Sequence, residues 1–387
     1  MTAPRARATI AGFLLGMTIA TTALAQKPGG VLRVQHRDSP ASMSILEEGS
    51  VSAIMPSMGV FNNLILFDQH VPQNRVESIV PDLATSWSWS EDGTELTFKL
   101  REGVKWHDGK PFTAADVKCT YDLLTGKAKE KLRLNYREAW FFNVDEVTTN
   151  GDSEASFHLK RPQPVLLSLL ASGYSPIYPC HVSARDMRTH PIGTGPFKFA
   201  EYKPNQSIKV TRNPDYWRPG RTYLDGIEYT MIADRSTAIL AFVTGKFDMT
   251  FPYDVTVPLL KDVKSQAPQA ICELKPMNGR ANLLVTGAPP FDNPVLRRAM
   301  NLDRKAFVDI LSEGINDIGA VLQPPPEGIW GMPPEILQSL PGYGPDVAKN
   351  REEARALMRL VGYRPDNRLK VKVSTAISPG IAIRLRS

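Results

Sequence analysis

Apolar and polar side chains alternate with a period of two between residues 84 and 100. Apolar residues recur at every second position on both sides of Asp92-Gly93, at Trp87, Trp89, Leu96, Phe98 and Leu100. Such alternation gives a strand one buried face, and an Asp-Gly pair between two such runs favours a tight turn. The pattern predicts a β-hairpin with one face in the core.

The alternation continues into the stretch VKWHDGKPF, residues 104–112. It places Val104 and Trp106 on the buried face and His107 on the outward face of the same strand. Asp108-Gly109 then predicts a turn. We therefore interpret His107 and Asp108 as architecture and not as catalytic groups, and we expect His107→Ala to cost little stability.

Two helices are predicted from their end signals. Thr113 and Asp116 have the spacing of a capping box, in which each side chain bonds the backbone N–H of the other residue. A second, apolar helix is predicted over residues 236–244, and Gly245 is suited to its C-terminal cap.

Gly193 and Gly195 have the spacing found at the start of a dinucleotide-binding loop. Such a loop opens a helix, whereas the residues after Pro196 read FKFAEY and alternate like a strand. A turn at 203–205 and a second alternating run at 207–213 follow. We predict an antiparallel strand pair here and no phosphate site.

The N-terminus has the three parts of a secretory signal. Arg5 and Arg7 precede an apolar run at residues 10–19, and small residues follow up to Ala25. The apolar run is shorter than the roughly 20 residues that span a bilayer, which argues against the alternative of a membrane anchor. Cleavage between Ala25 and Gln26 is expected, with export to the periplasm.

Composition adds little to this picture. The net charge of +6 is spread along the chain without the basic cluster typical of nucleic-acid proteins, so no nucleic-acid partner is predicted. The three cysteines, Cys119, Cys180 and Cys272, contain no C-x-x-C. At least one must stay unpaired within the chain, and the sequence leaves open whether the other two pair.

Enzyme motifs are missing from the sequence. Neither G-x-S-x-G nor H-E-x-x-H occurs, and the six histidines lack the close spacing of metal ligands. Cys180-His181 is the nearest approach to a thiol–imidazole pair, but sequence neighbours seldom face each other, so a structural loop is predicted. No metal and no cofactor are expected. An exported hydrolase acting on peptides is kept as the alternative function.

Residues 81–117, PDLATSWSWSEDGTELTFKLREGVKWHDGKPFTAADV, closely resemble the signature of the family 5 extracellular solute-binding proteins. Members of this family are the dipeptide, oligopeptide and nickel binders of bacterial ABC importers. Further similar segments are GTGPF at 193–197, GKFDM at 245–249, RANLLV at 280–285 and PPFDNPVLRRAM at 289–300, where Asn293 is suited to cap a helix. The resemblance implies a protein that captures a solute and delivers it to a membrane permease.

The resemblance also implies an α/β fold, the two-lobe periplasmic binding protein of type II with an extra subdomain on lobe I. The expected parts are a signal peptide (1–25), lobe I (26–70 and 191–275), its extra subdomain (71–190) and lobe II (276–387). Family members continue for well over a hundred residues beyond this point, so an incomplete second lobe is expected. Such a chain is expected to be unstable and to bind peptide poorly, and a non-functional truncated binding protein is a further alternative.

Seven residues are placed near the solute by their position relative to the family: Met43, Ser44, Tyr253, Asp254, Arg280, Asn282 and Trp330. The implied partners are a small peptide or related solute and the membrane subunits of an ABC permease, with the binding protein itself a monomer. The identity of the solute is left open among a peptide, a nickel complex, an opine and a sugar.

Overall fold

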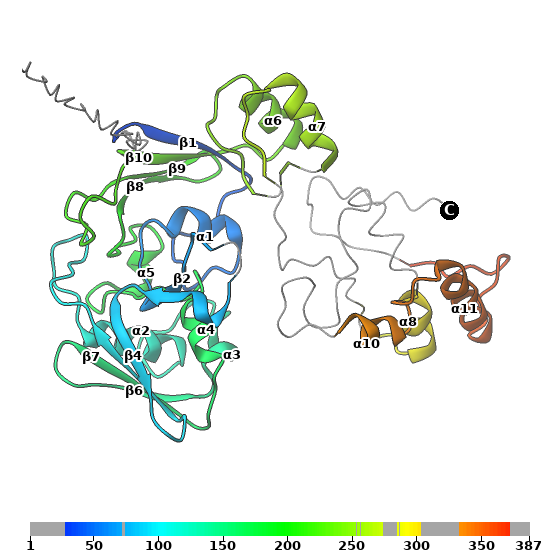
Figure 1. The fold of residues 1–387 in the computed structure, drawn as a ribbon, viewed down its shortest axis with the longest axis horizontal. Helices are drawn as coiled ribbons and strands as arrows, with labels where there is room; N and C mark the ends of the chain where they lie inside the picture. The colour runs from blue at the N-terminus through cyan, green and yellow to red at the C-terminus, as the bar shows by residue number, and fades with distance from the viewer. Residues whose placement is uncertain are drawn as a thin grey trace, which may run out of the picture.

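The computed structural model describes residues 28–71, 74–252, 254–255, 257–273, 285, 287–302 and 333–371 (Figure 1). The predicted cleavage site at Ala25 and Gln26 lies outside these residues. No helix in the described ranges is both long and apolar enough to cross a membrane.

A four-stranded sheet joins the start of the chain to residues almost two hundred positions later. Its strands, in spatial order, are β1 (Val31–His36), β10 (Gly226–Met231), β9 (Ser207–Arg212) and β8 (Phe197–Lys203). β1 runs parallel to β10, and the other neighbours are antiparallel. The strand pair predicted after Pro196 is confirmed as β8 and β9, and Asn205 adopts a φ of 58° in the turn between them.

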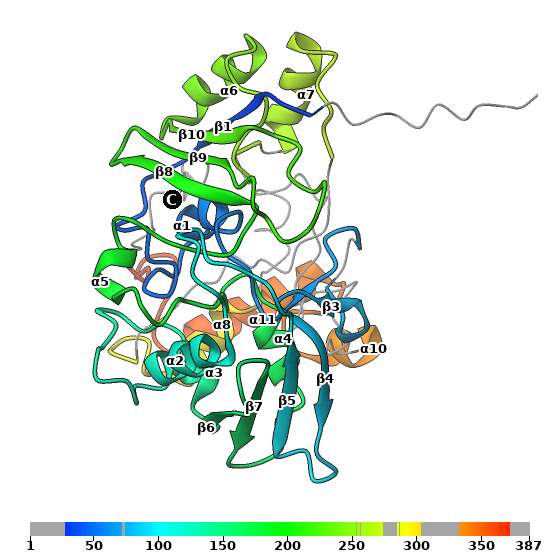
Figure 2. The same ribbon diagram turned by 90° about the vertical axis from the view of Figure 1, so that its left-hand side faces the viewer.

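A second four-stranded sheet and several short elements are inserted between β1 and β8. The sheet has the order β4 (Ala84–Trp89), β5 (Glu95–Leu100), β7 (Glu154–Leu159), β6 (Val144–Thr149). The remaining elements are α1 (Val51–Ser57), β2 (Ile65–Phe67), η1 (Val76–Ser78), β3 (Ile79–Pro81), α2 (Ala114–Leu124), α3 (Glu138–Phe141), α4 (Leu166–Leu170) and α5 (Ala184–Met187). α1 lies between the two sheets in both views (Figures 1 and 2).

The predicted hairpin is β4 and β5, and its inner face lies in the core. Leu96 and Phe98 are fully buried, and Phe98 packs edge-on against Phe157 of β7 with ring centroids 5.6 Å apart. Tyr121 of α2 covers the same face, 4.6 Å from the Phe157 ring. The two-residue period predicts this buried face because successive side chains of a strand point to opposite sides of the sheet, and only one side is buried here.

The capping box at the start of α2 is confirmed. The Asp116 Oδ2 atom accepts the backbone N–H of Thr113 at 2.9 Å and also the indole N–H of Trp106 at 3.2 Å. Lys105 forms only an isolated bridge to Pro111, so the strand predicted through residues 104–107 is wrong, although Val104 and Trp106 are buried as expected.

The outward placement of His107 is also wrong. Its Nδ1 accepts the backbone N–H of Gly193 at 3.2 Å, so Nε2 carries the proton and donates to the Gly195 carbonyl at 3.0 Å. Burial lowers the pKa of His107 to about 4, so the imidazole is neutral at pH 7. Gly193 is pressed against the chain so closely that a Cβ would lie 1.9 Å from the Val60 carbonyl oxygen. The Gly-x-Gly turn is therefore a packing contact.

The chain leaves the first sheet through two helices, α6 (Arg235–Val243) and α7 (Val257–Gln266). α6 is the apolar helix predicted over 236–244, and Gly245 follows it with a φ of 77°, as a C-terminal cap requires. Between the two helices, Met249 forms a parallel bridge with Val34 of β1.

Three further helices are described beyond residue 290: α8 (Pro294–Met300), α10 (Pro334–Ser339) and α11 (Val347–Leu360). Asn293 caps α8 by accepting the N–H of Val295 at 2.9 Å, as predicted. α8 and α11 pack together, and Arg298 bonds Glu353 between them at 2.6 Å. The division into lobes at residues 70, 190 and 275 stays a prediction.

Candidate functional site

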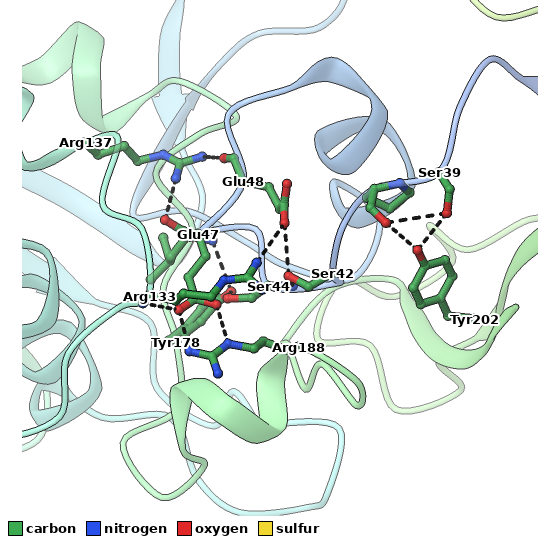
Figure 3. Close-up of polar contacts among 12 residues, drawn as sticks. Ser39, Ser42, Ser44, Glu47, Glu48, Arg133, Arg137, Tyr178, Arg188 and Tyr202 are labelled. Carbon is green, nitrogen blue, oxygen red and sulfur yellow. Dashed lines mark hydrogen bonds and ion pairs between the residues drawn. The ribbon is translucent and has the colours of Figure 1, made fainter. Parts of the chain in front are cut away.

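The loop that follows β1, residues 37–50, is fastened to strand β8 and to residues of the segment inserted between β1 and β8. At its start, the Ser39 hydroxyl lies 2.7 Å from the hydroxyl of Tyr202 in β8, and Tyr202 also bonds the Pro40 carbonyl. At its far end, the side chains of Arg137, Tyr178 and Arg188, from the segment between β1 and β8, hold residues 44–48 (Figure 3). We call residues 42–49 the anchored loop.

Glu47 is the centre of this anchorage. Its side chain is fully buried, and its two carboxylate oxygens accept Nε and Nη2 of Arg188 at 2.6 and 2.8 Å. The backbone N–H of Arg133 donates to the same carboxylate at 2.5 Å. Burial alone would raise the pKa of Glu47, but the bonds from Arg188 and Arg133 outweigh it and hold the pKa below its usual range. Glu47 is therefore ionised and paired.

Arg137 and Tyr178 hold the backbone of the anchored loop from the other side. Arg137 is 1% exposed and donates to the carbonyls of Leu46 and Glu48 at 2.8 and 2.9 Å. The Tyr178 hydroxyl accepts the N–H of Leu46 at 3.2 Å and lies 3.2 Å from the Ser44 hydroxyl. In a mobile loop these backbone groups would bond to water. Here they bond to protein side chains, so the conformation of the loop is preformed.

Met43 and Ser44, predicted near the solute, lie inside the anchored loop. Their exposed fractions are 1% and 0%, and the Ser44 hydroxyl is used by Tyr178. The backbone N–H of Met43 donates to the Arg188 carbonyl at 2.9 Å. Both side chains therefore contribute to the support of the loop. Direct contact with a solute stays a prediction for them.

Asp254, also predicted near the solute, fastens the segment between α6 and α7 to the end of β1. It is 3% exposed and accepts from Gln35 Nε2 at 3.1 Å and from Arg37 Nη2 at 2.8 Å. The Arg37 guanidinium lies over the ring of Phe251, 5.6 Å from its centroid. Tyr253, the neighbour of Asp254, lies outside the described residues, as do three other predicted residues, Arg280, Asn282 and Trp330.

The tip of the anchored loop, at Glu48 and Gly49, lies beside the exposed ring of Tyr136. Tyr136 is 57% exposed, and its ring lies against Gly49, where a Cβ would come 3.4 Å from it. Glu48 accepts the Ser42 hydroxyl at 3.1 Å and lies 3.7 Å from Arg133 Nη2, whose side chain is 47% exposed. The sequence does not predict the exposure of Tyr136, because LNYREAW has no period that separates an exposed aromatic residue from a buried one.

The thiol–imidazole pair considered for a hydrolase does not form. Cys180 is bonded to Cys119 in a disulfide, and His181 Nε2 lies 2.7 Å from the carboxylate of Asp108. The pairing that the sequence left open is thus Cys119–Cys180, with Cys272 the free thiol. Within the described ranges, no group of three histidine, cysteine or acidic side chains could hold a metal ion.

Residues 78–380 match the family described as bacterial extracellular solute-binding proteins, family 5. The chain belongs to this family. Among curated relatives, the glutathione-binding protein GsiB of Escherichia coli O1:K1 is 30% identical over 288 residues, which cover 73% of this chain and 52% of that protein. The chain thus spans about half the length of the curated relatives it matches.

Solved structures show the same fold. The periplasmic binding protein DppA of Helicobacter pylori, in complex with the peptide STSA, has a TM-score of 0.70 at 23% identity and matches 87% of this chain and 67% of that one. The oligopeptide-binding protein AppA of Bacillus subtilis, in complex with a nonapeptide, has a TM-score of 0.68 at 24% identity, over 88% and 66% of the two chains. The predicted class, a two-lobe α/β periplasmic binding protein, is confirmed.

Proposed function

We propose that the protein is the solute-capturing component of an ABC import system. It takes up a peptide-like solute between its lobes and delivers it to the membrane permease. The observation that carries this proposal is the family match over residues 78–380. The names of its relatives, which include glutathione-binding and oligopeptide-binding proteins, support a peptide-like solute.

The anchored loop supports a binding role because a preformed surface lowers the entropic cost of capture. Its buried anchors, Glu47 and Arg137, face the protein interior, whereas Tyr136 and the Gly49 backbone face outward. A peptide offers backbone groups and apolar side chains, which suit a wall with one aromatic ring and a few polar groups. We assign the tip of the anchored loop and Tyr136 to the lobe I wall of the solute site.

The proposal also covers the export of the protein and its oligomeric state. The signal-like N-terminus supports export to the periplasm and cleavage between Ala25 and Gln26. We take the protein to act as a monomer and to release its solute unchanged, so it is not an enzyme. N-terminal sequencing of periplasmic material should read QKPGG, and a mature protein that begins at Met1 would contradict the cleavage.

The test of the function is a comparison of retention with turnover. The natural protein that contains residues 26–387 is titrated calorimetrically with glutathione and with mixed di- and oligopeptides, and the same mixtures are incubated and analysed by mass spectrometry. Stoichiometric binding with unchanged peptides is expected. Catalytic turnover would support the hydrolase instead, and the absence of binding for every peptide would refute the proposed solute class.

A further inference from the structure

The Cys119–Cys180 disulfide ties helix α2 to the segment that supports the anchored loop. Its Cα atoms are 5.7 Å apart, within the usual range for a disulfide. Cys119 is half-buried in α2, whereas Cys180 is exposed at the surface. We call residues 178–188 the buttress segment.

The buttress segment supports the anchored loop at both of its ends. At one end, the Tyr178 hydroxyl binds Ser44 and the N–H of Leu46. At the other end, the Arg188 carbonyl accepts the N–H of Met43 and the Arg188 guanidinium pairs with Glu47. The disulfide lies between these two ends. A change at Cys180 therefore acts on the part of the chain that shapes the loop.

We propose that Cys180 is a thiol-exchange site, open to low-molecular-weight thiols, whose modification loosens the anchored loop. The thiolate of the small molecule attacks Cys180 Sγ and forms a mixed disulfide there. The Cys119 sulfur leaves as a thiolate and takes a proton from water. A second small thiolate can then attack the mixed disulfide, which releases the small-molecule disulfide and leaves Cys180 reduced.

Access selects Cys180 as the sulfur that is attacked. Exchange requires an in-line approach to one sulfur. Residue Cys180 is exposed, with its Sγ 3.1 Å from the Ala115 carbonyl oxygen, whereas residue Cys119 is half-buried in its helix. The neighbouring His181 side chain is paired elsewhere, with its Nε2 2.7 Å from the carboxylate of Asp108.

The opened disulfide leaves the fold in place because two other bonds hold the buttress segment to α2. The N–H of Cys180 donates to Asp116 Oδ1 at 2.8 Å, and the N–H of Tyr178 donates to Thr120 Oγ1 at 2.9 Å. Both lie on the Tyr178 side of the segment. The effect is therefore greatest toward Arg188, where the anchored loop receives its ion pair.

The first experiment locates the adduct. The protein with Cys272→Ser, which keeps only the one pair, is held in a mercaptoethanol redox buffer under native conditions, alkylated and analysed by peptide mass spectrometry. Mercaptoethanol is not peptide-like, so its adduct cannot arise from solute capture. We expect the adduct on Cys180 and the alkyl group on Cys119. An adduct on Cys119, or no reaction before the protein unfolds, would overturn the proposal.

The second experiment measures the loop itself. Amide hydrogen exchange is compared between the oxidised and the mercaptoethanol-treated protein. The amide of Met43, which bonds the Arg188 carbonyl, is expected to exchange several-fold faster after treatment. The amide of Leu46, which bonds Tyr178 on the held side, should change less, and the amide of Phe98 in strand β5 should stay unchanged. An exchange rate at Met43 that is the same in the oxidised and the treated protein would show that the buttress segment does not depend on the disulfide. Neither experiment measures solute binding. Only an effect of the loosened loop on solute affinity would rest on the proposed function, so failure of the thiol exchange can be distinguished from failure of the proposed function.

Discussion

Arg188 binds both carboxylate oxygens of Glu47 across 141 residues of sequence. A carboxylate in this position is stabilised only while its partner is present, because the Glu47 side chain has no exposure to water. The pair therefore makes the anchored loop dependent on α5 and the residue that follows it.

Loss of the guanidinium should be costly. Arg188→Ala is expected to lower the free energy of unfolding by about 3 kcal/mol, because it leaves a buried charge with only the Arg133 N–H as a partner. Arg185→Ala, at an exposed position in α5, is the matched control and should change stability by less than about 0.5 kcal/mol. Urea denaturation measures both variants, and equal effects would contradict the assigned role of the pair.

His107 predicts a pH dependence of stability. Its pKa is about 4 in the folded protein, against roughly 6.5 for an unperturbed histidine in the unfolded chain. Between these values the unfolded state binds more protons, so stability rises with pH from about 4 to 6.5 and is lost as pH falls through that window. The loss attributable to His107 is about 3 kcal/mol at most.

The measurement is urea denaturation from pH 7 to pH 4 for the wild type and for His107→Gln. The variant should be less stable at pH 7, by about 1–3 kcal/mol, because the flexible glutamine amide does not hold an acceptor at the Gly193 N–H and a donor at the Gly195 carbonyl as the rigid ring does. Its stability should fall less steeply below pH 6.5 than that of the wild type. Parallel curves for the two proteins would show that His107 does not cause the dependence.

Trp106 and Lys105 test the buried face beside His107. Trp106 is 2% exposed, so Trp106→Ala should destabilise by about 3–5 kcal/mol through the cavity it leaves. Trp106→Phe keeps an aromatic ring and removes the N–H that reaches Asp116, for a smaller loss of about 1–3 kcal/mol. Lys105→Ala is the exposed neighbouring control. Thermal melting ranks the three variants, and any other order would refute the packing described for this segment.

Tyr136 tests the proposed solute wall. Tyr136→Ala should weaken binding of the solute about tenfold, which corresponds to 1.4 kcal/mol, and should leave the melting temperature nearly unchanged because the ring is exposed. Phe142→Ala removes an aromatic side chain of similar exposure, 56%, beyond the other end of α3 and serves as the control. Calorimetric titration measures the affinity of each variant for the solute. Equal affinities for Tyr136→Ala and the wild type would show that Tyr136 does not contact the solute.

Local elements were predictable from the sequence because their causes are local. The hairpin around Asp92-Gly93 follows from a two-residue period, and the starts of α2 and α8 follow from capping residues within three positions. The role of His107 could not be predicted because its partners lie 86 and 88 residues away. A period describes which face a residue occupies within one strand and carries no information on what covers that face.

The site was predictable only in outline for the same reason. Family position placed Asp254 near the solute, and in the structure Asp254 lies between α6 and α7, where it contacts Gln35 across 219 residues. It did not distinguish side chains that support the anchored loop, such as Ser44, from the exposed Tyr136. Exposure is a property of the assembled fold, and neither residue type nor spacing determined it here.

The parallel pairing of β1 with β10 predicts an order of folding. Val31 lies beside Gly226, so strand β1 cannot pair with β10 until residues 226–231 have been synthesised. The inserted sheet β4–β7 closes over much shorter separations and can form first, since loop closure and contact order favour local pairs. In the interval β1 exposes both its edge and Val34, which is 1% exposed once folded. Substitutions that weaken β10 should therefore slow the folding of the protein. Before β10 pairs with β1, the newly synthesised chain is most prone to aggregate or to bind a chaperone.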